Sequence, residues 1–403
     1  MTSFDVLILN AQFRQSLVST RSLGRHGLRV AAAGPHPNLP TFASRWCGQS
    51  FVFPAEETPD SYLAGLENWL ERSQARALIP SHDGTIALLR SHRARLEQRV
   101  RLALADEAAL AIAVDKTQTL AAAQRLGAKI PPQFVVRTAS DVAKAMREIG
   151  LPAVSKPAES WMQNGGEVVR MGPQLVTTAG EARQSLEGII RVGGAALFQP
   201  LLTGRREAVS LLYAGGEVYA RFAQWAKRTR PPLGGESVLR QSIAVPSDIG
   251  PQAEALVREI NLEGYSEIEY RRDDRGVPYL MEINPRLSAS VEIAVRAGVD
   301  FPYLLYLWAS GERIPRVTGY RTGGWMRHLG ADIEVMRTML EQPGRPGNSP
   351  AIQAVLDFGL SFLRPMSYDY FDWQDPLPAV RATTDFAGDM MKRLLYRSRR
   401  KRS

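Results

Sequence analysis

Cysteine is nearly absent from this chain, which carries a single thiol, Cys47, among its 403 residues. One thiol cannot form an intrachain disulfide or a thiolate cluster around a metal ion, so the sequence favours a reducing compartment and a cytoplasmic location. Long apolar runs are also missing, because no stretch approaches the roughly 20 apolar residues that a membrane-spanning helix needs. The first residues, MTSFDVLILN, lack a basic lead and a long apolar core, so we do not expect them to act as a signal peptide.

Several widespread catalytic motifs are missing as well. The chain has no GxxxxGK[ST] sequence, which excludes a P-loop site, and the NAQFRQS stretch after the first expected strand has no glycine for a dinucleotide-binding turn. It has no HExxH motif and no serine, histidine and acid arrangement that supports nucleophilic catalysis. The five histidines are dispersed, without the spacing of a metal site: His26, His36, His82, His92 and His328.

Acidic residues are the minority among the charged ones, 41 against 50 Lys and Arg, and the net charge is +9. A basic protein binds nucleic acid or anionic lipid, or it handles phosphates and carboxylates. Part of the excess lies in the tail MKRLLYRSRRKRS, whose apolar component is small. For this tail we favour a solvated, frayed end over a weak contact with a membrane surface, and we find no clear sign of a nucleic-acid partner.

The chain is too long for one ordinary core and fits two or three domains. Residues 1–105 alternate strand-like and helix-like segments, which predicts an α/β domain with a parallel sheet. Residues 106–310 predict an α+β domain with mixed or antiparallel sheets, including one helix over 107–127 and a hairpin over 265–284. Residues 311–403 form a C-terminal extension with helical pieces but no motif that predicts a function.

An apolar strand with a polar end is present in LMEINPRLSAS, residues 280–290. Glu282 and Asn284 point to the same face, because side chains alternate across a strand. Glu269, thirteen residues before Glu282 on the other strand of the hairpin, lies opposite either Glu282 or Asn284. When two carboxylates lie so close to each other, either a cation lies between them or one of them takes up a proton. The oxygen atoms of Glu269, Glu282 and Asn284 are the kind of ligand that suits Mg²⁺. The alternative, a solvated acidic strand face, is the weaker interpretation.

Arg286 follows directly after this strand. Beside a metal-bound phosphate, its guanidinium would neutralise the charge that develops during phosphoryl transfer. The alternative is a surface arginine that pairs with Glu282 or Asp300. Its position next to the acidic pair favours the first interpretation, so Arg286 is a candidate catalytic residue.

The segment SEIEYRRDDRGVPYLMEINPRLSASVEIAVRAGVDFP resembles the C-terminal metal-binding segment of the ATP-grasp superfamily, especially of its carbamoyl-phosphate-synthase-like and carboxylate–amine ligase branches. The resemblance extends over residues 107–302, behind the small α/β domain that the family usually has in front. It implies an ATP-grasp fold over 106–310 that binds the nucleotide between two subdomains, with a lid subdomain over 129–200.

The resemblance assigns roles to further residues. Lys116 in AVDKTQT and Lys156 in VSKP match the two phosphate-contacting lysines, and SWMQNGGEV, with Gly165 and Gly166, matches the loop that closes over the phosphates. The other matches surround the nucleoside: Gln199 and Leu202 in FQPLL at the adenine edge, Glu207 at the ribose hydroxyls and Met281 against adenine.

Some of these matches depart from the family pattern or have a simpler explanation. The family more often has an acidic residue where Gln199 stands, although an amide oxygen can also accept from the adenine amino group. Glu207 has the alternative of a salt bridge with Arg205 or Arg206. Simple alternation places Met281 on the strand face opposite the neighbouring metal ligand.

The activity that the resemblance implies is an ATP-dependent ligation of a carboxylate to an amine through an acyl phosphate. Its cofactors would be ATP and two Mg²⁺ ions, with Mn²⁺ as a substitute, and its substrates would be small carboxylates and amines such as amino acids. A homodimer is an expectation at the level of the family. Two alternatives stay open: a bicarbonate-using carboxylase or carbamoyl-type enzyme, and a basic protein that binds nucleic acid or a membrane surface.

The substrate side is less defined by the sequence. The stretch WAKRTRPPLGGESVLRQS carries cations that could bind a substrate carboxylate, with Arg228 as a candidate catalytic residue beside Lys156 and Arg286; a solvated basic loop is the alternative. The cations of this stretch are Lys227, Arg228, Arg230 and Arg240. In PSHDG, His82 or Asp83 could contact the amine, but capping of the loop by Ser81 or Asp83 is the favoured role.

Overall fold

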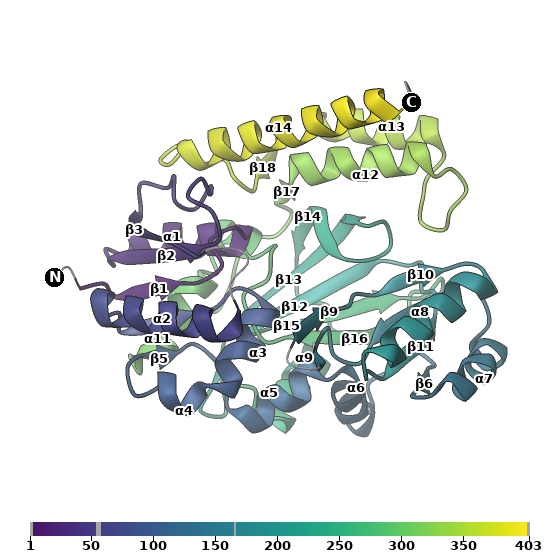
Figure 1. Cartoon of the computed structure of the whole chain (residues 1–403), viewed down its shortest axis with the longest axis horizontal. Helices are drawn as coiled ribbons and strands as arrows, with labels where there is room; N and C mark the ends of the chain where they lie inside the picture. Colours follow the sequence, from purple (N-terminus) through teal and green to yellow (C-terminus); the bar gives the residue numbers. More distant parts are fainter. Residues whose placement is uncertain (1–2, 54–57, 165–166, 401–403) are drawn as a thin grey trace.

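A parallel sheet forms the first part of the structure, a computed structural model that describes residues 3–53, 58–164 and 167–400. Its strands lie in the order β3-β2-β1-β4-β5 (Figure 1). The strands β1, β2 and β4 are buried apolar runs, as expected for a parallel sheet covered on both faces, and the predicted α/β domain is confirmed. The elements are β1 (Val6–Ile8), α1 (Arg14–Arg25), β2 (Val30–Gly34), β3 (Cys47–Val52), α2 (Pro59–Ser73), β4 (Ala77–Ile79), α3 (Asp83–Ser91), α4 (Arg93–Leu96) and β5 (Arg101–Leu102).

The order of these strands creates a crevice at one edge of the sheet. The chain leaves β1 through α1 to β2 on one side, and β4 lies on the other side of β1. Open α/β sheets bind ligands where the strand order reverses in this way, at the carboxyl ends of the strands. The start of α1 and the loop after β4 are joined there, because Gln15 Nε2 donates to the Ser81 carbonyl at 2.6 Å.

A smaller antiparallel sheet has the strand order β10-β7-β11-β6 and lies at the right of Figure 1. It packs against α7 and α8 around its own apolar core. It lies in the segment predicted as the lid. A two-stranded hairpin, β8 and β9, projects beside it. The elements of this part are α5 (Glu107–Val114), α6 (Lys116–Arg125), β6 (Phe134–Val136), α7 (Ala139–Ile149), β7 (Ala153–Pro157), β8 (Trp161–Asn164), β9 (Glu167–Arg170), β10 (Gln174–Val176), α8 (Ala179–Arg191) and β11 (Ala196–Pro200).

The helix expected over 107–127 is divided in two. Asp115 adopts an extended conformation between α5 and α6, and its carboxylate accepts from the backbone N–H groups of Thr117 and Gln118. Aspartate favours this N-cap role over a helix interior, because its short side chain satisfies the free N–H groups of a new helix. The break turns Lys116 into the first residue of α6, at the wall of the central cavity.

The largest sheet has seven strands in the order β16-β15-β12-β13-β14-β17-β18. The hairpin predicted over 265–284 is present as β15 and β16 in antiparallel register, and β12 and β13 form a second antiparallel hairpin. β17 and β18 come from beyond residue 310, so the C-terminal extension contributes the last strands of this sheet. The elements up to residue 310 are β12 (Arg206–Ala214), β13 (Glu217–Arg230), β14 (Glu236–Ile243), α9 (Gly250–Glu259), β15 (Gly264–Arg272), β16 (Pro278–Asn284), α10 (Glu292–Ala297) and α11 (Phe301–Ser310).

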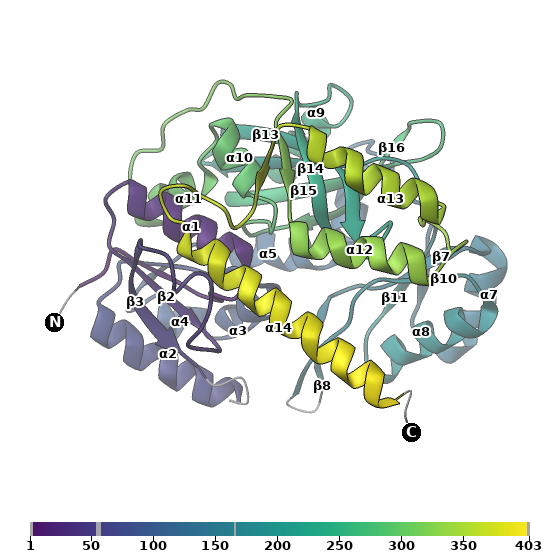
Figure 2. The same cartoon turned by 90° about the horizontal axis from the view of Figure 1, so that it is seen from above.

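Three helices of the C-terminal segment form a layer over one side of the molecule, green to yellow in Figures 1 and 2. α14 runs along the outside of this layer, from the N-terminal domain toward the lid (Figure 2). Across residues 3–53, 58–164 and 167–400, no helix combines the length and the apolar character needed to cross a bilayer. The elements are β17 (Trp325–Arg327), α12 (Leu329–Glu341), α13 (Ala351–Leu360), the 3-10 helix η1 (Ser361–Leu363), β18 (Met366–Tyr368) and α14 (Leu377–Arg400).

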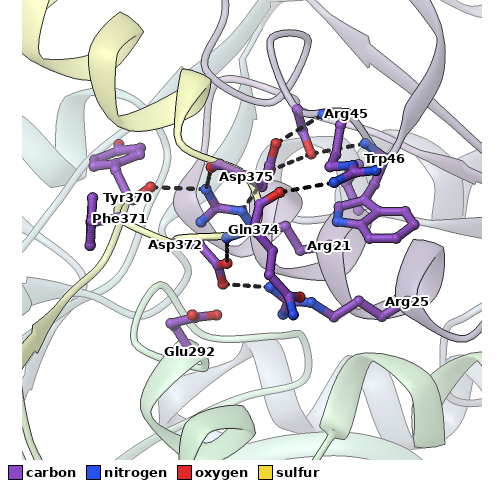
Figure 3. A network of polar contacts seen from close by, with 12 residues as sticks. Arg21, Arg25, Arg45, Trp46, Glu292, Tyr370, Phe371, Asp372, Gln374 and Asp375 are labelled. Carbon is purple, nitrogen blue, oxygen red and sulfur yellow. Dashed lines mark hydrogen bonds and ion pairs between the residues drawn. The ribbon is translucent and has the colours of Figure 1, made fainter.

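Buried aspartates join the C-terminal segment to the N-terminal domain and to the large sheet. Asp375 accepts from Arg21 Nε of α1 at 2.9 Å (Figure 3). It also accepts from Ser44 Oγ at 2.7 Å. Asp369 binds Arg14 of α1 at 2.7 Å and also Arg240 of β14, and these cations hold the pKa of its carboxyl far below the usual range although burial alone would raise it. The C-terminal segment is therefore clamped to both the N-terminal domain and the large sheet.

Loss of one of these clamps should cost considerable stability. We expect Asp375→Asn to lower the free energy of unfolding by about 3–5 kcal/mol, because Arg21, only 1% exposed, would keep its charge without a carboxylate partner. The matched variant Asp385→Asn removes a carboxylate whose ion pair with Arg381 is solvent-exposed, and should change stability by less than about 1 kcal/mol. Urea unfolding of the full chain measures both, and equal effects of the two variants would contradict the assignment.

Candidate functional site

One cavity of about 890 Å³ lies where the three parts meet. Its walls come from β7 and β11 of the lid sheet, from β15 and β16 of the large sheet, from the turn between β13 and β14, and from the loops after β1 and β4. The crevice at the reversal of strand order in the N-terminal sheet thus opens into the same space as the predicted nucleotide site.

The predicted metal ligands meet in this cavity. Glu269 lies directly opposite Glu282 in the β15–β16 register, the first of the two predicted pairings. Asn284 Nδ2 donates to Glu269 Oε1 at 3.1 Å, so the amide adjoins the pair. Arg206 of β12 contacts Glu269 Oε1 at 2.5 Å and provides a counter-charge on the same sheet face.

The donor set fits a metal ion that is shared with phosphate groups. It offers two carboxylates and one amide oxygen, the hard ligands that Mg²⁺ prefers, and Mg²⁺ usually takes only one or two carboxylates beside phosphate oxygens and waters. The part of the chain that the structure describes contains no group of three or more His, Cys, Asp or Glu side chains that could hold a metal ion alone. The arrangement therefore fits Mg²⁺ bound together with a nucleotide better than a metal held entirely by protein.

Two lysines face the acidic pair. Lys116 Nζ lies 3.5 Å from Glu282 Oε2 and donates to Ser160 Oγ at 3.2 Å. Burial, only partly offset by the nearby Glu282, lowers the pKa of Lys156 to about 8. Burial alone would raise the pKa of Glu282, but Lys116 and Lys156 outweigh it and hold that pKa below its usual value. The carboxylate thus stays ionised near neutral pH, as a metal ligand must.

Met281 differs from the expectation based on alternation. Glu269 pairs with Glu282 while the next residue, Tyr270, pairs with Leu280, so Met281 is an extra residue in a β-bulge. The bulge shifts the pattern, and Met281 lines the cavity together with Glu282 instead of facing away from it. The error came from applying an unbroken period of two to a strand that carries one additional residue.

Arg286 lines the cavity, but its partner is neither of the acids considered from the sequence. It binds Asp83, the first residue of α3, through Nε at 2.5 Å and Nη2 at 2.8 Å. Asp83 makes no capping bond for α3, so its expected role as a loop cap is replaced by this bidentate pair. Desolvation would raise the pKa of Asp83, yet Arg286 holds it below its usual value. Asp83 therefore fixes the guanidinium beside the acidic cluster.

The predicted adenine contacts lie at the lid side of the cavity. Gln199 and Leu202 both line it. Gln199 Nε2 donates to Gln133 Oε1 at 3.0 Å, whereas its own buried Oε1 has no hydrogen-bond partner in the protein. A buried acceptor without a partner is costly unless a ligand supplies a donor, and an adenine amino group is such a donor. Gly165 and Gly166, assigned to the phosphate loop, lie outside the described residues.

Two predicted site residues lie away from this cavity. Glu207 alternates with Arg206 along β12 and points to the other sheet face, where it binds Arg205 at 3.0 Å and Arg272 at 2.7 Å. The salt bridge considered as its alternative is thus present for Arg205. Arg228 also differs from expectation, since both its Nε and Nη2 bind the fully buried Asp332 of α12, at 2.6 and 2.7 Å.

The N-terminal side of the cavity has polar and aromatic walls. Of the four cations in the stretch 225–242, only Arg230 lines the cavity, together with the neighbouring Gly234–Ser237 turn. His82 stacks on Phe13 with ring centroids 4.8 Å apart and meets Trp161 edge-on at 4.9 Å. Burial lowers the pKa of His82 to about 4, so its ring is neutral at pH 7. This side of the cavity therefore combines a neutral imidazole with two aromatic rings and the Arg230 guanidinium.

Several residues of the site were missed in the sequence. Glu267 lines the cavity and feels the charges of both Glu269 and Arg286. Burial, and after it repulsion from Glu269, raises the pKa of its carboxyl. Alternation along β15 from Glu269 could have identified it. Arg14 and Tyr370 also line the cavity, but they come from α1 and from beyond β18, and no local motif connects them to the site.

Comparison with known proteins agrees with this geometry. A family model described as "ATP-grasp in the biosynthetic pathway with Ter operon" matches residues 195–328. The chain is 23% identical over 312 residues to the carbamoyl phosphate synthase large chain of Thermus thermophilus, covering 73% of this chain and 29% of that one. It is 26% identical over 208 residues to D-alanine–D-alanine ligase B of Pseudomonas putida, covering 49% of this chain and 64% of that one.

A solved structure extends the likeness in fold to most of the chain. The biotin carboxylase complex from Campylobacter jejuni superimposes with a TM-score of 0.64 at 16% identity, covering 80% of this chain and 74% of that one. The chain spans less than two thirds of the length of the curated relatives it matches. The family match over residues 195–328, the two relatives and the shared fold agree with the paired carboxylates and lysines of the cavity, and together they show that this chain is similar to proteins of the ATP-grasp superfamily.

Proposed function

We propose that the protein is an ATP- and Mg²⁺-dependent ligase that joins a carboxylate to an amine through an acyl phosphate and releases ADP and phosphate. The observation that carries the proposal is the meeting of Glu269, Glu282 and Asn284 with Lys116 and Lys156 in one cavity that continues to the N-terminal crevice. A nucleotide bound at the lid side would place its terminal phosphate beside these groups, facing the N-terminal side of the cavity.

The proposed first step needs positioned charges more than a reactive side chain. A substrate carboxylate oxygen attacks the γ-phosphorus of ATP, the bond to the β–γ bridging oxygen breaks, and ADP leaves with its electron pair. Mg²⁺, held by Glu269, Glu282 and Asn284, would supply Lewis-acid stabilisation of the phosphate charge. Lys156 and Lys116 bind phosphate oxygens, and Arg286, oriented by Asp83, faces the charge that develops during the transfer.

In the proposed second step an amine attacks the acyl carbon of the acyl phosphate. The C–N bond forms, the C–O bond to phosphate breaks, and the amine proton is lost to solvent or to a base. Water must be kept from the acyl phosphate, and the walls of the cavity serve this purpose: Trp161 of the β8–β9 hairpin packs on the start of α3, where a Cβ on Gly84 would lie 3.0 Å from its ring. An amino acid fits the mixed polar and aromatic end of the cavity.

A bicarbonate-dependent reaction is the second candidate. It is favoured by two proteins that this chain resembles, the carbamoyl phosphate synthase large chain and the biotin carboxylase complex. Bicarbonate would replace the organic carboxylate in the first step, so the same cavity groups would act on it. The two reactions differ in what stimulates ATP turnover.

Phosphate release separates these candidates. We expect Mg·ATP turnover to rise at least about tenfold with one pair from a panel of amino acids and amines, because binding both substrates aligns the reacting groups. The measurement is coupled phosphate release in buffers purged of carbon dioxide. Stimulation by bicarbonate alone would assign the second candidate, and the absence of stimulation by every pair would contradict the ligase.

Removing one carboxylate of the acidic pair should abolish turnover. Glu282→Gln is expected to lower kcat about 100-fold or more while leaving the circular dichroism spectrum unchanged, because the side chain is one-third exposed and its loss affects charge more than packing. Glu259→Gln, an exposed acid of α9 paired with Arg125, is the matched control and should keep full activity. Full activity of Glu282→Gln would refute the metal assignment.

ATP affinity should depend on pH through Lys156. Its pKa of about 8 means that the side chain is charged at pH 7 and mostly neutral at pH 9, so binding of phosphate at pH 9 requires proton uptake. We expect the Kd for ATP to rise about tenfold between pH 7 and pH 9. Lys156→Arg, which stays charged over this range, should flatten the profile in the same fluorescence titration. A flat profile for the unmodified protein would speak against the assignment.

A further inference from the structure

Apolar side chains are exposed mainly in the C-terminal layer of helices. α13 packs on the body through Ala354 and Phe358, whose ring lies under the Arg327 guanidinium at 4.3 Å. Its opposite face, by helical periodicity, carries Ile352, Leu356 and Leu360, which are 57–77% exposed. Leu363 follows in η1 and is 80% exposed. A helix on a protein surface normally turns its apolar side inward, so this outward apolar face needs an explanation.

α14 repeats the same inverted arrangement. It contacts the body through Pro378 and through Phe386, which packs on Gly330 of α12. Leu377, Val380 and Met391 lie on the opposite face and are 58–63% exposed. Figures 1 and 2 show α13 and α14 in the same outer layer of helices, and the exposed apolar side chains of α13, η1 and α14 are here called together the C-terminal apolar surface.

The charge beside this surface is strongly positive. From Met390 to the last residue the sequence has seven Lys and Arg and no acidic residue. Lys392 is 83% exposed and lies 3.8 Å from Asp389 Oδ1, and Arg393 is 53% exposed and binds Glu334 Oε1 at 2.9 Å, so the basic run begins at solvent-exposed positions of α14. A second copy of the chain would bring the same cationic cluster to a shared interface, whereas an anionic lipid headgroup layer neutralises the cluster and accepts the apolar side chains.

We propose that the C-terminal apolar surface, formed by the outward faces of α13, η1 and α14, docks the enzyme on an anionic phospholipid bilayer. The helices would lie in the interface plane, with the leucines and Met391 in the acyl boundary and the basic end of α14 among the headgroups. The solvated-tail interpretation of the sequence considered α14 alone, and α13 supplies the apolar component that this tail lacked. The cavity does not use these helix faces, so docking is independent of the proposed function.

Vesicle sedimentation of the full chain tests the proposal. The protein should bind vesicles of phosphatidylcholine mixed with phosphatidylglycerol at least about tenfold more tightly than vesicles of phosphatidylcholine alone, and high salt should weaken this binding. Equal binding to both vesicle types, or no binding to either, would overturn the proposal.

Paired variants separate the two contributions. Leu356→Asp with Leu360→Asp should lower vesicle affinity about tenfold or more, whereas Leu126→Asp, also at an exposed apolar side chain, should not. Lys392→Gln with Arg393→Gln should weaken binding to anionic vesicles, whereas Lys144→Gln with Arg147→Gln on α7 removes the same charge without effect.

The Kd of each variant for ATP is measured as a control, because an unchanged Kd shows that the variant is still folded. A dimer in solution that Leu356→Asp with Leu360→Asp dissociates, without vesicle binding by the unmodified chain, would assign the surface to a second copy.

Discussion

Two carboxylates that face each other across a hairpin are the constraint around which the site is arranged. Glu269 and Glu282 occupy directly opposed positions of β15 and β16, where like charges repel and destabilise the pairing unless cations intervene. The protein supplies Arg206 and Lys116 at hydrogen-bonding or ion-pair distance, and Lys156 nearby. Each of these cations comes from a different element, so the acidic pair draws β12, α6 and the lid strand β7 toward one point.

The second constraint comes from the position of the cavity, which is lined by the N-terminal domain, the lid sheet and the large sheet and is kept only while these parts stay together. The aspartates of the C-terminal segment meet this need for two of the parts, the N-terminal domain and the large sheet, with buried ion pairs to α1 and β14, close to where Tyr370 lines the cavity. Breaking one partner of such a pair is strongly destabilising, because a charge remains in a dry environment. The C-terminal segment is thus part of the structural frame of the site, and only its outer helix faces are left for another role.

The sequence allowed the prediction of the features that depend on local order. The parallel N-terminal sheet followed from buried apolar runs, and the opposed pair Glu269 and Glu282 followed from two strands around one turn. Simple alternation put Met281 on the wrong strand face, because a β-bulge leaves no mark in the period of two, whereas the family resemblance had placed it beside the nucleotide. The break at Asp115 was missed because alanine-rich helical spacing continues on both sides of it.

Other features depend on contacts between distant segments, and local patterns could not predict these. Arg228 looked like a free cation in a basic loop, but its partner Asp332 lies on a helix 104 residues later. Arg286 was weighed against nearby acids, while Asp83 from the N-terminal domain is the acid that binds it. β17 and β18 have three residues each, too short to show any periodicity. Long-range ion pairs and edge strands therefore had to come from the three-dimensional structure.

The central claim is that the acidic pair binds ATP through a metal ion. Calorimetric titration of ATP into the unmodified protein, once with excess Mg²⁺ and once with EDTA, tests it directly. The account predicts binding at least about tenfold tighter with Mg²⁺, because Glu269 and Glu282 repel bare phosphates and attract them only when a cation lies between. Equal or tighter binding in EDTA would contradict it.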